Sequence, residues 1–198
     1  NPDLARGSIE QHDFLHEEKV FEFLEKRRGL LEGVVITGGE PTLHPDLLRI
    51  CAKIRGLGYP VKLDTNGSKP NIVKKLIDSN LINYVAMDIK TAPDNYSPLI
   101  WKKAEPEKIL ASTDIIMNSG LDYEFRTTCL KPFIDQKSIK KISGIIKGAR
   151  LYALQRCNDK NVLDRDFFNN NDRLIKEDEF QKLKLIASEQ VDECIIRG

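Results

Sequence analysis

Residues 34–42 read Val-Val-Ile-Thr-Gly-Gly-Glu-Pro-Thr, a short β-branched run that ends in a glycine pair and an acidic turn. Two later segments follow the same plan, with Val-Lys-Leu-Asp-Thr-Asn-Gly at 61–67 and Tyr-Val-Ala-Met-Asp-Ile-Lys at 84–90. Such runs favour strands, and the Gly and Asn residues favour the turns that end them. Segments of helical period lie between the runs. This alternation predicts a parallel α/β sheet.

The alternation extends to the end of the chain. Strands are expected at Val34–Thr37, Val61–Asp64, Tyr84–Asp88, Tyr123–Thr128, Leu151–Gln155 and, more weakly, Glu193–Ile196. Helices are expected at Asp13–Arg28, Pro45–Leu57, Pro70–Ser79, Pro106–Ser119, Asp135–Lys147 and Lys176–Glu189. In a parallel sheet the first helix would be the crossover from an earlier strand. We therefore expect one strand and its loop upstream of Asn1, and a partial (β/α)6 barrel to which this chain supplies five strands.

Composition indicates one globular domain spanning residues 1–198. The 31 basic and 30 acidic residues leave a formal net charge of +1, which favours neither nucleic acid nor an anionic membrane as partner. No apolar run approaches the roughly 20 residues that span a bilayer. The four cysteines form no Cys-x-x-Cys pair, so we expect reduced, mostly buried thiols in a cytoplasmic protein.

The ends of the predicted strands carry the candidate functional residues, because ligands of parallel α/β folds bind at the carboxyl ends of the strands. Gly38 and Gly39 allow a ligand to approach the backbone, and Glu40 with Pro41 places a carboxylate on a stiff turn. A fixed anion there would suit an ammonium group. The same tetrapeptide is also compatible with a plain connection between strand and helix.

Asp64 and Asp88 end neighbouring strands and should lie close together. With Thr65 they offer hard oxygen ligands for a cation, although aspartates at such positions also serve as turn or cap residues. Lys90 and Arg126 add positive charge that could bind a ligand carboxylate, or could be solvated surface residues.

The three segments at 34–42, 61–67 and 84–90 together resemble the radical S-adenosylmethionine superfamily, and specifically its activases of glycyl radical enzymes. The resemblance is strongest to activating proteins of anaerobic ribonucleotide reductase, and it runs from Asn1 to about Gln155. Asn1-Pro2-Asp3 is similar to the sequence that follows the Cys-x-x-x-Cys-x-x-Cys motif of that family. The iron–sulfur ligands are therefore expected upstream of Asn1.

The resemblance implies two cofactors, S-adenosylmethionine and a 4Fe–4S cluster. It also implies the partial parallel (β/α)6 barrel of the radical S-adenosylmethionine enzymes. It implies a glycyl radical enzyme as protein substrate and a flavodoxin or ferredoxin as electron donor. It assigns cofactor binding to Gly38, Gly39, Glu40, Pro41, Asp64, Thr65, Asn66, Asp88, Lys90, Arg126 and Gln155, and a monovalent cation to Asp64, Thr65, Met87 and Asp88. No residue is assigned a catalytic role.

Two other functions remain open from the sequence. One is a radical enzyme acting on a small nucleobase precursor, as in deazaguanine synthases, which share the Gly-Gly-Glu-Pro and Thr-Asn-Gly turns. The other is a binding protein that has lost its cluster. His12 and His16, four residues apart, could be metal ligands but have no acidic or cysteine partner arranged with them. Tyr96 and Trp101 mark either a docking loop or local packing.

Overall fold

Six parallel strands form one sheet in the computed structural model, which describes residues 15–92, 106–158 and 173–198. The strands follow one another in chain order, and each pairs with the next. They are β1 (Val34–Ile36), β2 (Val61–Thr65), β3 (Tyr84–Asp88), β4 (Asp122–Cys129), β5 (Tyr152–Arg156) and β6 (Cys194–Arg197). The predicted parallel α/β sheet is confirmed. The expected count of five strands is wrong, because the weak C-terminal candidate forms β6 beside β5.

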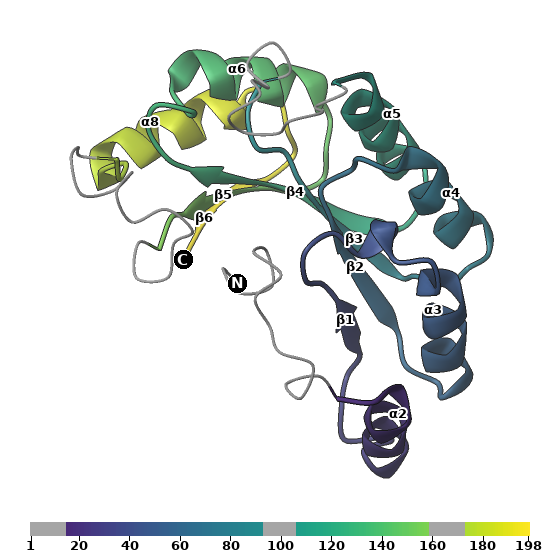
Figure 1. Cartoon of the computed structure of the whole chain (residues 1–198). Coiled ribbons are helices and arrows are strands. Elements are labelled where there is room, and N and C mark those ends of the chain that lie inside the picture. The colour runs from purple at the N-terminus through teal and green to yellow at the C-terminus, as the bar shows by residue number, and fades with distance from the viewer. Residues whose placement is uncertain (1–14, 93–105, 159–172) are drawn as a thin grey trace.

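Helices connect the strands and lie along the outer face of the curved sheet (Figure 1). They are α2 (Glu17–Lys26), α3 (Leu47–Gly56), α4 (Pro70–Asp78), α5 (Pro106–Met117), α6 (Gln136–Ile145) and α8 (Glu177–Ser188), with a short 3-10 helix, η2 (Pro41–Leu43). Proline begins both α4 and α5, as expected from its preference for the first helical turn. Among the described residues, no helix is long and apolar enough to cross a membrane.

The core lies between the sheet and these helices. Alternate side chains of a strand point to opposite faces, so Leu63, Val85 and Phe125 are fully buried against the helices. Their neighbours Lys62 and Glu124 point instead to the concave face of the sheet. The strands are therefore apolar on one face and charged on the other, and the charged face is the one that the helices leave open.

The first strand forms one edge of the sheet within the described part of the chain. β1 pairs with β2 on one side, and Val35 in the middle of β1 is 52% exposed. The sheet is open rather than a closed eight-stranded barrel, as predicted.

Candidate functional site

The carboxyl ends of the central strands bring together residues that are far apart in sequence. Asp88 on β3 is the register partner of Arg126 on β4, and Asp64 on β2 is the partner of Ala86, two residues before Asp88. The side chains of all three residues meet on the concave face. Gln155 lies one strand farther along, where it is the partner of Thr128.

Arg126 binds the two aspartates at once. Its Nε lies 2.8 Å from Asp88 Oδ1, and its Nη1 lies 3.2 Å from Asp64 Oδ2. Lys90 Nζ contacts the other carboxylate oxygen of Asp88 at 2.9 Å. Burial acts to raise the pKa of Asp88, but the charges of Lys90 and Arg126 outweigh it and hold that pKa below its usual range. Asp88 is therefore ionised at neutral pH.

The four residues predicted to surround a monovalent cation do not present their side chains to one point. Thr65 and Met87 are register partners, and both are buried on the helical face of the sheet. Asp64 and Asp88 face the concave side, where the guanidinium of Arg126 lies between them. In this arrangement Arg126 supplies the positive charge at the two carboxylates, and the cation stays a prediction.

Glu40 joins the turn after β1 to the turn after β2. Its Oε1 accepts hydrogen bonds from the Thr42 backbone N–H at 3.1 Å, from the Thr42 hydroxyl, and from the Thr65 hydroxyl at 2.8 Å. Its Oε2 accepts from the Asn66 backbone N–H at 2.7 Å. This carboxylate, predicted to bind an ammonium group, thus already accepts hydrogen bonds from four protein donors. These bonds hold the turns after β1 and β2 together.

The glycine pair before Glu40 leaves room in front of the turn. Gly38 has a φ of 140°, which favours glycine, and a Cβ placed on Gly38 or Gly39 would meet no atom of the described residues within 4 Å. A ligand can therefore approach the backbone there without displacing a side chain.

The turn after β2 is held from the helical side. Gly67 has a φ of 76°, and its carbonyl accepts a 2.6 Å hydrogen bond from the buried hydroxyl of Ser112 on α5. Asn66 Oδ1 accepts from the Ser68 backbone N–H at 2.9 Å. Together with Glu40, these contacts fix the position of Thr65 and Asn66 before any ligand binds.

Asp64 carries a buried acceptor that the described residues do not satisfy. Among these residues its Oδ1 has no hydrogen-bond partner, and Lys62 Nζ lies 3.8 Å from it. A buried acceptor left unpaired is costly, which suits an atom reserved for a ligand donor. This unpaired acceptor and the cations of Lys90 and Arg126 lie within one cluster of charges.

Three charged residues of the same face were not predicted. They are Glu124, which is only 2% exposed, and the two cations that pair with it, Lys62 and Arg197. The alternation Lys62–Asp64 and Glu124–Arg126 places both pairs on one face of the sheet, so this signal was available in the sequence.

The cysteines are not arranged as cluster ligands. All four lie in the described part of the chain and none is in a disulfide. Burial raises the pKa of Cys51 and Cys194 to about 11 and that of Cys129 to about 12. Among the described residues, no group of three or more His, Cys, Asp or Glu side chains could hold a metal ion.

The thiols should react accordingly. We expect a disulfide reagent such as DTNB to modify one thiol of the native protein rapidly, because Cys157 is partly exposed whereas the other three are buried. The other three should react only at the rate of unfolding. Cys157→Ser should abolish the fast phase, and more than one fast thiol would contradict the structure.

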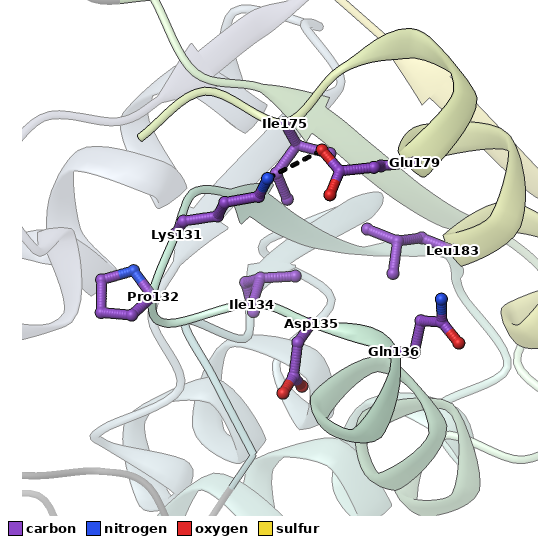
Figure 2. A pocket seen from close by; sticks show the side chains of 8 residues that line it. All are labelled: Lys131, Pro132, Ile134, Asp135, Gln136, Ile175, Glu179 and Leu183. Atoms are coloured by element: carbon purple, nitrogen blue, oxygen red, sulfur yellow. Dashed lines mark hydrogen bonds and ion pairs between the residues drawn. The ribbon is translucent and has the colours of Figure 1, made fainter. Parts of the chain in front are cut away.

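A pocket of about 400 Å³ begins just past the carboxyl end of β4. Figure 2 shows it between the segment that follows β4, the start of α6, and α8, with Lys131 and Glu179 paired across it at 2.8 Å. None of the predicted cofactor residues lines it. His12, Tyr96 and Trp101 lie outside the described residues.

Comparison with known proteins assigns the chain. The family model described as the Radical SAM superfamily matches residues 6–141. The chain belongs to the radical SAM superfamily. Membership implies S-adenosylmethionine and a 4Fe–4S cluster as cofactors. The chain is also 34% identical, over 171 residues, to a Methanocaldococcus jannaschii protein named "Putative glycyl-radical enzyme activating enzyme MJ1227", covering 84% of this chain and 70% of that protein.

Solved structures agree with the radical SAM fold. A domain of a pyruvate-formate lyase-activating enzyme from Bacteroides vulgatus superposes with a TM-score of 0.67 at 19% identity, covering 85% of this chain and 100% of that one. Streptococcus suis SuiB bound to S-adenosylmethionine gives a TM-score of 0.65 at 15% identity, covering 91% of this chain and 43% of that one. At these identities the likeness concerns the fold alone, and it supports a partial radical SAM barrel.

Proposed function

We propose that this radical SAM chain belongs to an activase that cleaves S-adenosylmethionine reductively and generates a glycyl radical on a partner enzyme. The partner would be of the anaerobic ribonucleotide reductase or pyruvate formate-lyase type. The observation that carries the proposal is the 34% identity to a protein named as a glycyl-radical enzyme activating enzyme, over 70% of that protein's length. The fold of a pyruvate-formate lyase-activating enzyme domain is consistent with it.

The residues at the strand ends would hold the amino-acid end of the cofactor. Asp64 Oδ1 would accept a hydrogen bond from the ammonium group of the cofactor. Lys90 and Arg126 would donate hydrogen bonds to its carboxylate. Gly38 and Gly39 would let the methionine part approach the backbone. Gln155, one strand away, would contact another part of the cofactor.

S-adenosylmethionine beside a reduced 4Fe–4S cluster supplies one-electron cleavage of the sulfonium. No set of described side chains could hold that cluster, so we propose that its thiolates lie outside the described residues, in a Cys-x-x-x-Cys-x-x-Cys segment before Asn1. The chain would contribute by orienting the cofactor, because Arg126 and Glu40 hold the polar side chains of the site in place.

The proposed substrate is a glycine in a loop of the partner protein. The described strands form an open sheet rather than a closed barrel, and a lateral opening of such an incomplete barrel would admit a peptide loop. One electron from a flavodoxin or ferredoxin in the cytoplasm, together with transfer of a hydrogen atom from the glycine Cα to the 5′ carbon, balances the reaction. The products are methionine, 5′-deoxyadenosine and the glycyl radical.

The test is anaerobic turnover of the cluster-loaded protein with a reductant. We expect 5′-deoxyadenosine and a glycyl signal in electron paramagnetic resonance only when the partner enzyme is present, and no signal when its radical glycine is replaced by alanine. Conversion of a nucleobase precursor at a comparable rate would favour the deazaguanine-type function instead. Binding of S-adenosylmethionine without any cluster assembly would favour a binding protein.

A further inference from the structure

Glu124 is the most deeply buried carboxylate of the concave face. It lies on β4, two residues before Arg126, and is 2% exposed. Its Oε2 and Oε1 accept from Arg197 Nη2 and Nη1 at 2.7 and 3.1 Å, and its Oε1 accepts from Lys62 Nζ at 3.3 Å. Arg126 Nη1 lies 3.9 Å from the same oxygen. One buried carboxylate thus lies within 4 Å of cations from three strands.

Lys62 lies between two acidic residues that compete for it. Its Nζ is 3.3 Å from Glu124 Oε1 but 3.8 Å from Asp64 Oδ1, which is beyond hydrogen-bond distance. Lys62 Nζ also contacts the ring of Tyr84, whose centroid is 5.1 Å away. As a result, no donor among the described residues makes a hydrogen bond to the buried Asp64 Oδ1.

We propose that Glu124 is a positioning residue for the cofactor site: by holding Lys62 it keeps Asp64 Oδ1 available for the ammonium group of a bound amino acid. The proposal rests on the proposed cofactor site. Lys62 is near enough to bind Asp64 after a small rotation, and the carboxylate of Glu124 prevents this. Glu124 itself would not touch the cofactor.

Loss of the charge at position 124 should therefore act through Lys62. In Glu124→Gln the shape of the side chain is kept, but its attraction for Lys62 falls. Lys62 is then expected to bind Asp64 Oδ1 and to compete with the ligand ammonium. A charge-assisted hydrogen bond lost to such competition corresponds to a roughly tenfold to hundredfold weaker affinity.

The experiment measures ligand affinity by anaerobic calorimetry on the cluster-loaded protein. S-adenosylmethionine should bind Glu124→Gln at least tenfold more weakly than wild type, whereas 5′-methylthioadenosine, which lacks the ammonium and carboxylate, should bind both proteins equally. Adding Lys62→Met to Glu124→Gln should restore S-adenosylmethionine affinity to within about threefold of wild type, because the competitor is gone.

A matched control lies on the same strand. Asp122, two residues before Glu124, is 78% exposed and pairs with Arg150 at 3.0 Å, so Asp122→Asn should leave both affinities unchanged. If Glu124→Gln binds S-adenosylmethionine as tightly as wild type, or if Lys62→Met does not rescue it, the proposed role of Glu124 is wrong. If the wild type itself does not bind S-adenosylmethionine, the proposed function fails instead. Equal weakening of 5′-methylthioadenosine binding would indicate general damage to the fold and would also overturn the proposal.

Discussion

Arg126→Met is expected to lower the free energy of unfolding by about 3 kcal/mol at pH 7 and to weaken S-adenosylmethionine binding at least tenfold. Arg126 is 13% exposed and bridges Asp64 and Asp88, so its removal leaves two carboxylates facing each other with one cation fewer. Breaking a buried pair by removing one partner costs about 3 to 5 kcal/mol. The lower end applies because Asp88 is 26% exposed and keeps Lys90 as a partner.

The loss should depend on pH with a defined sign. Arg126 and Lys90 lower the pKa of Asp88 in the folded state, so Asp88 contributes stability that is fully present above its unfolded pKa of about 3.9. That contribution disappears as the pH falls through the lowered folded value. The difference between wild type and Arg126→Met, measured by urea unfolding, should be constant from about pH 5 to 7 and shrink below about pH 4.

The conservative variant keeps the test informative if Arg126→Met folds poorly. Arg126→Lys retains the charge, but a single ammonium cannot span Asp64 and Asp88 as the guanidinium does. We expect it to lose less stability than Arg126→Met. Equal stability of wild type and Arg126→Met at pH 7, or a difference that persists unchanged at pH 3, would contradict the role assigned to Arg126.

Gly67→Ala is expected to destabilise the protein by about 2 to 5 kcal/mol. A left-handed backbone costs an alanine about 1 to 2 kcal/mol, and overpacking adds about 1 to 3 kcal/mol. The new Cβ would overlap Met87 Cε and lie 3.0 Å from Met87 Sδ and 3.3 Å from Ser112 Cβ. The turn that carries Thr65 and Asn66 would shift, so cofactor binding should weaken as well.

Gly29→Ala separates the two contributions. Gly29 has a φ of 75°, almost the same as the 76° of Gly67, but a Cβ there would meet no atom within 4 Å in the part of the chain that the structure describes. The free energy of unfolding of Gly29→Ala, measured by thermal or urea unfolding, should therefore be lower than that of wild type by only about 1 to 2 kcal/mol. Met87→Ala introduced into Gly67→Ala should reduce the effect of the glycine substitution by removing the clash. Equal losses at Gly67 and Gly29 would show that the packing against Met87 is unimportant.

Local patterns were sufficient to predict the order of strands and helices. The strand Tyr84–Asp88 was predicted with its observed ends, since a β-rich run followed by a charged turn is a local signal. The other elements differ at their ends by a few residues. The weak run near the C-terminus became β6 because β5 offered it a parallel partner, which no local pattern reports.

The sequence by itself determined the parallel α/β plan and placed Asp64, Asp88 and Arg126 at strand ends, because hydrophobic period and turn residues act over a few neighbours. Only the tertiary structure decided which atoms these residues contact. It gave Glu40 four protein donors, put Arg126 between the two aspartates and drew Lys62 toward Glu124. Apart from the two that Thr42 makes with Glu40, those contacts join residues 25 or more positions apart, and they depend on strand register and on competition between charges.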